Sequence, residues 1–233
     1  MLADEVNIGK DTLRRIVVED LRKRLNPEEK DRRIAACQDL IATTDSDPDF
    51  FKKIVTGDET CCFAYDPTTQ RQSAAWVGET SPRPKKLRFQ KSRVKTMFVI
   101  FFDWQGVIHK EFVREGETIN AVYYKGGMER LLNRIRRVRP SMCESGDWFL
   151  LHNTPSHNAT IVKQFLAQRK VSVLDHPSYS PDLEPADYFL FQKVKSHLKG
   201  HLFDSISDIQ KAVTSTLTFW RRNYFFNFST LCI

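Results

Sequence analysis

Two acidic residues in this 233-residue sequence occupy positions that suit metal or acid–base chemistry. The first is Asp58, in a stretch (54–65) whose composition predicts a strand. Alternation along a strand puts Thr56, Asp58 and Thr60 on one side. A carboxylate on a central strand is costly unless it is paired or binds a metal ion. The alternative is an edge strand, on which Asp58 would be solvated.

The second acid, Asp187, follows a loop that contains Pro181 and Pro185. The two prolines make this loop rigid, and Asp187 then falls in the first turn of a helix predicted over 186–199. Backbone N–H groups at the start of a helix favour a carboxylate, so helix capping is one interpretation of Asp187. A functional carboxylate is the other.

Five stretches of the sequence carry a resemblance to a known family. They are VTGDET (55–60), DWFLLH (147–152) followed by an Asn and PSH (155–157), HPSYSPDLEPADYFLF (176–191), SPRPKKLRFQKSRVKTM (81–97) and LNPEEKDRRIAACQDLIA (25–42). The sequence resembles the mariner family of DNA transposases, of the Tc1/mariner superfamily, over about residues 2–218. It is similar to the transposase part of the members that are fused to a SET domain, and it contains no SET segment.

The resemblance implies a site of three carboxylates that holds two divalent metal ions, Mg²⁺ or Mn²⁺. Asp58 matches the first carboxylate and Asp187 matches the third. The second is missing, because the family's His-Asp-Asn-Ala-Pro turn stands here as His152-Asn153-Thr154-Pro155. Either the Asp was deleted, or it became Asn153 beside a one-residue deletion. An ungapped count instead puts His152 in that position, so Asn153 is the degenerate second site residue and His152 the alternative ligand.

This loss bears directly on the expected reaction. Two metal ions together activate water and stabilise the leaving oxygen of an in-line phosphoryl displacement. Mg²⁺ requires hard oxygen ligands, whereas His suits softer metals. The resemblance implies cleavage of DNA at terminal inverted repeats and strand transfer into a TA site, and we expect this activity to be impaired. The alternatives are a catalytically dead, domesticated DNA-binding or dimerisation protein and a pseudogene product, so whether the chain is an enzyme stays open.

Basic residues predict where DNA binds. The first 25 residues follow a helix-turn-helix pattern, whose second helix would enter the major groove. By resemblance, the basic tract at 82–95 belongs to an insertion that clamps DNA. Five arginines between 130 and 139 add a further surface for phosphate contact. The predicted DNA-binding residues are Lys10, Thr12, Arg14, Arg15, Arg83, Lys85, Lys86, Arg88, Lys91 and Arg93.

The elements that must position these residues alternate between strands and helices. Strands are expected over 54–65, 70–77, 96–103, 107–112, 148–152 and 171–174, and helices over 26–43, 121–138, 158–170, 186–199 and 206–217. This order predicts an α/β, RNase H-like mixed sheet with helices on both faces, preceded by a partial helix-turn-helix. The expected units are a helix-turn-helix remnant (1–25), a linker helix (26–50), a catalytic domain (51–218) with a clamp-like insertion at about 66–95, and a divergent tail (219–233) that does not continue the last helix.

Composition limits the remaining possibilities. Hydrophobic residues make up 41% of the chain, which excludes a wholly disordered protein. The apolar runs are far shorter than the roughly 20 residues of a membrane span, so no membrane partner is expected. The net charge of +7 favours a polyanionic partner. Together with the resemblance, these features imply double-stranded DNA as the partner, a homodimer and a nuclear location.

Overall fold

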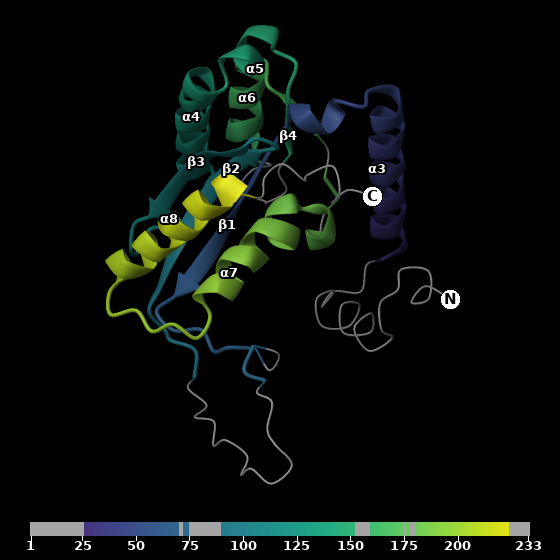
Figure 1. Cartoon of the computed structure of the whole chain (residues 1–233). Helices are drawn as coiled ribbons and strands as arrows, with labels where there is room; N and C mark the ends of the chain where they lie inside the picture. The colour runs from purple at the N-terminus through teal and green to yellow at the C-terminus, as the bar shows by residue number, and fades with distance from the viewer. Residues whose placement is uncertain are drawn as a thin grey trace.

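A computed structural model describes residues 26–69, 72–74, 90–151, 159–174, 176–177 and 180–223 of the chain (Figure 1). The predicted helix-turn-helix, with Lys10, Thr12, Arg14 and Arg15, lies outside these residues. So do four of the basic residues of the expected clamp, Arg83, Lys85, Lys86 and Arg88, and the turn with His152 and Asn153. Among the described residues, no helix is long and apolar enough to cross a membrane.

A five-stranded mixed sheet forms the centre of the domain, with strand order β3-β2-β1-β4-β5. The strands are β1 (Ile54–Phe63), β2 (Lys95–Asp103), β3 (Gly106–Val113), β4 (Phe149–Leu151) and β5 (Ser172–Leu174). The first three pair antiparallel, and β4 and β5 extend the sheet in parallel from β1. The predicted mixed sheet is confirmed.

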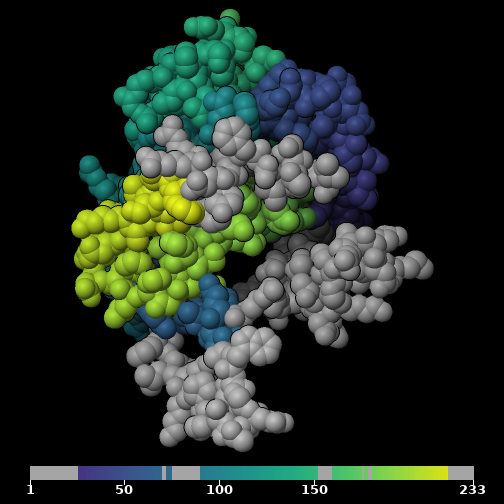
Figure 2. Space-filling view, viewed as in Figure 1, coloured from purple at the N-terminus to yellow at the C-terminus, as the bar shows by residue number. Residues whose placement is uncertain are grey.

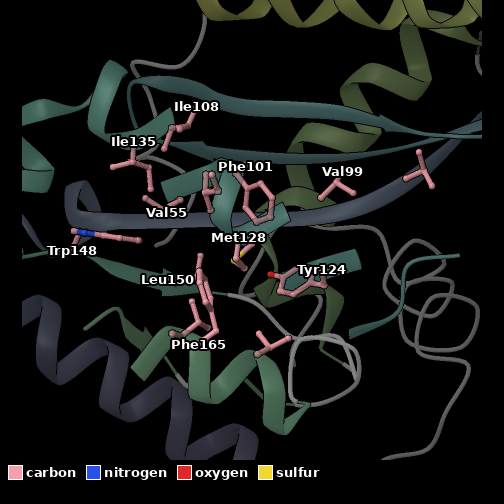
Figure 3. Close-up of a cluster of buried hydrophobic side chains, with 14 residues drawn as sticks. Val55, Val99, Phe101, Ile108, Tyr124, Met128, Ile135, Trp148, Leu150 and Phe165 are labelled. Carbon is pink, nitrogen blue, oxygen red and sulfur yellow. The ribbon is translucent and has the colours of Figure 1, made fainter. Parts of the chain in front are cut away.

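Helices cover both faces of this sheet and enclose two hydrophobic cores. On one face, α4 (Ala121–Val138) and α6 (Thr160–Gln168) pack over Phe101 of β2 and Leu150 of β4, with Met128 of α4 in the same core (Figure 3). On the other face, η4 (Ala186–Phe191), α7 (Gln192–Leu198) and α8 (Ile206–Asn223) pack over β2. Because side chains alternate along a strand, β1, β2 and β3 contribute to both cores.

Two details of the predicted elements are wrong. The strand expected over 70–77 is absent from its described part, because Gln72 and Ser73 form a turn closed by the Ser73 N–H and the Thr69 carbonyl at 3.0 Å. The last helix does not end at Leu217 but continues to Asn223. No Pro or Gly interrupts the sequence there, so the helical hydrogen bonding proceeds into the segment assigned to the tail.

The helix α3 (Pro27–Ser46) begins as predicted, at a capping box. The side chain of Asn26 accepts from the Glu29 N–H at 2.8 Å, and the Glu29 side chain accepts from the Asn26 N–H at 2.9 Å. No residue of α3 is buried, although Cys37 and Leu40 line a cavity of about 660 Å³ against the domain. A short 3-10 helix, η2 (Phe50–Lys53), connects α3 to β1.

Replacing Gly57 of β1 with Ala should destabilise the domain by about 1–3 kcal/mol. A Cβ atom at this position would overlap the ring of Phe101 and the carbonyl oxygen of Ile100, and backbone cannot move aside as a flexible side chain can. Urea unfolding measures the change. Gly126→Ala in α4 is the control, because its Cβ would meet only the end of the Arg130 side chain, at 3.2 Å. That variant should be neutral or slightly stabilised, and an equal loss in both variants would contradict the steric argument.

Candidate active site

Asp58 lies on the central strand of the sheet and not on an edge. Strand β1 is flanked by β2 and β4, and Asp58 pairs in register with Ile100 of β2. Ile100 belongs to the core beneath η4 and α7, and antiparallel partners point to the same face, so Asp58 also faces these helices. Its carboxylate is half-buried. The alternative interpretation, a solvated edge-strand residue, is therefore wrong.

Asp187 approaches Asp58 from the first turn of η4, which is a π-helix. Burial raises the pKa of the Asp187 carboxyl, and the negative charge of Asp58 raises it further, while Lys195 opposes both effects. A Coulombic effect of this kind requires the two carboxylates to lie close together. Within the described residues, no side-chain hydrogen bond caps the start of η4, so capping does not account for this acid.

A third carboxylate, Glu184, is buried beside this pair and was not selected by the sequence analysis. Its Oε1 accepts a hydrogen bond from the hydroxyl of Thr56 at 2.7 Å, and its Oε2 lies 3.6 Å from Nε2 of His176. Burial, together with the charges of Asp58 and Asp187, raises the pKa of Glu184 to about 8, although the hydrogen bond from Thr56 opposes the shift. The sequence did offer one signal for a buried polar partner at this site. Thr56 lies two residues before Asp58, and alternation places both side chains on the same face of β1.

The raised pKa of Glu184 predicts a pH-dependent stability. Between pH 4.5, the ordinary pKa of a Glu carboxyl, and pH 8, the folded chain keeps a proton that the unfolded chain releases. Stability should therefore fall as the pH rises through this window, by up to about 1.4 kcal/mol per pH unit. Glu184→Gln keeps an acceptor for Thr56 and removes the ionisation. Relative to this variant, the unmodified chain should lose stability between pH 5 and pH 8 in urea unfolding.

The control for this measurement is Glu129→Gln, on the exposed side of α4. It should follow the unmodified chain at every pH. Asp58, Glu59 and Asp187 repel the charged form of Glu184, whereas His176 would favour it if protonated. If Glu184→Gln and the unmodified chain show the same pH dependence, the carboxyl of Glu184 is already ionised at neutral pH.

Other acids near the site have separate partners. Asp182, in η3 (Pro181–Leu183), binds the guanidinium of Arg33 and so connects α3 to the loop that leads to Asp187. Asp147 forms an ion pair with Lys53 at 2.6 Å, and this pairing raises the pKa of Lys53. Each of these two acids is thus paired with a basic residue.

The structure describes two of the predicted DNA-binding residues. Lys91 lies over the ring of Phe63, with Nζ 3.8 Å from the ring centre, and 3.7 Å from Asp66. Arg93 is exposed. Contact of Lys91 and Arg93 with DNA phosphates therefore stays a prediction.

The fit of a divalent metal ion can be judged from Asp58 and Asp187. Both are hard oxygen donors, and the charge of one raises the pKa of the other, which is a repulsion that a cation would relieve. In the part of the chain that the structure describes, no group of three or more potential ligands is close enough to hold a metal ion. Among the described residues, Asp58 and Asp187 are thus two of the three expected ligands. Residues 152–153, where the third is expected, lie outside the described part of the chain.

Comparison with known proteins supports the resemblance to DNA transposases. The family model "Transposase (partial DDE domain)" matches residues 66–144. The chain is 33% identical to the Mariner Mos1 transposase of Drosophila mauritiana over 80% of its own length and 54% of that protein. It is 31% identical to the histone-lysine N-methyltransferase SETMAR of Homo sapiens, over 91% of its own length and 32% of that protein. The chain thus spans about half, or less, of these two relatives.

Solved structures agree with the fold. A Mos1 transposase paired-end complex with the left transposon end superposes with a TM-score of 0.78 and 28% identity, over 97% of this chain and 68% of that one. The catalytic domain of Mos1 mariner transposase gives a TM-score of 0.71, over 88% of both chains. This RNase H-like mixed sheet, with helices on both faces, is the fold of the catalytic domain of such DNA transposases. Over most of its own length, the chain resembles the mariner family of these transposases.

Proposed function

We propose that this chain acts as a mariner-type transposase. Such a protein cleaves DNA at terminal inverted repeats and transfers the cleaved strand to a TA target. The observation that carries the proposal is that Asp58 of β1 faces η4, whose first turn contains Asp187. These residues come from the TGDE and ADY motifs, 129 positions apart in the sequence, and the fold brings them together on one face of the sheet.

Each residue of the site has a distinct role in this proposal. Asp58 is held by the ladder of a central strand, and Asp187 by the π-helix, so both carboxylates are oriented before DNA arrives. The hydrogen bond from Thr56 to Glu184 connects the loop that precedes Asp187 to β1. A divalent ion bound by the two aspartates would supply activation of water and stabilisation of the leaving oxygen. Structures of the Mos1 paired-end complex with Mn and with Mg support Mn²⁺ or Mg²⁺ as that ion.

We further propose that catalysis is impaired, because Asn153 or His152 stands at the second carboxylate position. A neutral amide or imidazole offsets less of the metal charge than a carboxylate does. The second candidate function, a catalytically dead protein that binds DNA or dimerises, follows from the same observation.

The proposed partner is double-stranded DNA, with transposon terminal repeats as the recognised sequence. Paired-end complexes of Mos1 with a transposon end support this partner and a homodimer. Double-stranded DNA as the substrate supports a nuclear location.

The proposed function is tested by nicking of a supercoiled plasmid that carries terminal repeats, with Mn²⁺ present. We expect slow nicking by the unmodified chain, and none by Asp58→Asn or Asp187→Asn, since each variant removes half of the described donor set. Asp204→Asn, at an exposed position, is the matched control and should nick at the unmodified rate. Nicking that survives both site variants would overturn the proposal. Binding of the repeat without any nicking would favour the second candidate function.

A further inference from the structure

A basic groove of about 640 Å³ lies at the edge of the sheet formed by β3. It runs between α4 on one face of the sheet and α8 on the other, on the side of the domain away from α3 (Figures 1 and 2). None of the described residues that line it is acidic. The lining cations are Lys110 of β3 and Arg130, Arg134 and Arg137 of α4, and His109 joins them.

Two of these groups already have an acidic partner. Arg130 binds Glu111 through two hydrogen bonds, of 2.7 and 2.8 Å, and His109 lies 3.2 Å from the same carboxylate. The basic partners lower the pKa of Glu111 to about 2 against the opposing effect of burial, so this acid is charged and neutralises its neighbours. The charge of the groove therefore comes mainly from the other cations.

Lys110, Arg134 and Arg137 form no ion pair with any described residue. Lys110 donates a hydrogen bond to the hydroxyl of Thr214 at 2.6 Å, and burial lowers its pKa. Arg134 donates through Nε to the carbonyl oxygen of Ile108 at 3.2 Å. Three cationic side chains thus face one groove without a carboxylate to balance them.

The edge of the sheet explains how residues from both faces reach the same groove. A β-bulge lies between β2 and β3, where the register shifts between Phe101 and Phe102. After the bulge, Lys110 faces α8 while His109 and Glu111 face α4. Bulges redirect side chains at sheet edges, and here the bulge places Lys110 across the strand from the arginines of α4.

We propose that this groove binds the phosphate backbone of duplex DNA, with Lys110, Arg134 and Arg137 as the contacting groups. The choice of DNA as the polyanion rests on the proposed function. Strand β3 lies two strands from β1, which is roughly 10 Å across the sheet, so a duplex held there would lie near the face that carries Asp58. These contacts would be independent of DNA sequence, because phosphates carry no base information.

The same charges have a second interpretation, protection of an exposed sheet edge. Charged side chains on an edge strand prevent it from pairing with another chain, and Arg134 occupies one of the edge carbonyls of β3. Edge protection predicts no effect on DNA binding when these charges are removed, so a binding measurement separates the two interpretations.

The test is fluorescence anisotropy with a random-sequence duplex, across a series of salt concentrations. The variants are Arg137→Gln and the double variant Arg134→Gln/Arg137→Gln. Each lost phosphate contact should reduce the salt slope by about 0.9 and the affinity by about eightfold at 0.1 M salt, so the double variant should bind up to about 60-fold more weakly. The matched control is Arg114→Gln/Arg169→Gln, which removes the same charge from exposed positions outside the groove lining.

The control pair should bind within about twofold of the unmodified chain, because distant exposed charges are screened by salt. Equal losses in both double variants would mean that the positive charge of the whole surface, and not this groove, attracts DNA. No loss in either variant would favour the interpretation as edge protection. Arg137→Gln alone guards against an effect on folding, since of the two substituted arginines it is Arg134 that bonds the edge strand. Asp58→Asn should bind the duplex normally, so a failure of the nicking test and a failure of this proposal are distinguishable.

Discussion

Insertion of one aspartate between His152 and Asn153 should raise Mg²⁺-dependent nicking of plasmid DNA by about 10²–10⁴-fold over the unmodified chain. The insertion supplies the carboxylate that the mariner resemblance places there, while Asp58 and Asp187 already lie together. A completed pair of metal ions stabilises charge in the transition state by several kcal/mol, which corresponds to this range of rates. Nicking should also change its metal preference, from Mn²⁺ towards Mg²⁺, since carboxylate oxygens suit the harder ion.

Two controls isolate the carboxylate from the added length of the turn. Insertion of Asn at the same point lengthens the turn without the charge and should leave the rate low. Asp58→Asn in the Asp-insertion background should abolish the gain. Rapid Mg²⁺-dependent nicking by the unmodified chain, lost in Asp58→Asn, would mean that the site needs no second aspartate.

The largest expected effect on stability comes from Arg139→Met, which should cost about 3–5 kcal/mol. The guanidinium of Arg139 binds both carboxylate oxygens of Asp103, at 2.6 and 3.0 Å, and the Asp103 side chain is completely buried. Removing the arginine leaves a buried charge whose other described partner is the Gln105 N–H, at 2.9 Å. Urea unfolding of the variant at pH 7 measures the loss.

A neighbouring arginine provides the matched control. Arg136→Met, at an exposed position on α4, should change stability by less than about 0.5 kcal/mol. In the double variant Asp103→Asn/Arg139→Met the buried charge is gone, so its loss should be smaller than the sum of the single losses. If Arg139→Met and Arg136→Met cost the same, the buried pair contributes nothing.

The arginines between 130 and 139 also show where inference from sequence stopped. The run predicted five phosphate contacts, yet Arg139 is buried with Asp103, Arg130 binds Glu111 and Arg136 binds Asn133. Only Arg134 and Arg137 line the groove without an acidic partner among the described residues. All five look alike in sequence, because the partners of Arg130, Arg134 and Arg139 are set by long-range packing against β2 and β3.

The order of most elements and the two candidate catalytic aspartates, Asp58 and Asp187, could be predicted from the sequence itself. The alternation of β1 put Asp58 and Thr56 on one face, and the proline-flanked loop put Asp187 in a first helical turn, because both patterns follow from local backbone geometry. Tertiary structure alone decided that β1 is central, that Glu184 is buried against Thr56 and that Lys110 meets the arginines of α4. These outcomes depend on which strands pair and which faces pack, and such contacts join residues far apart in the chain, beyond the reach of any local pattern.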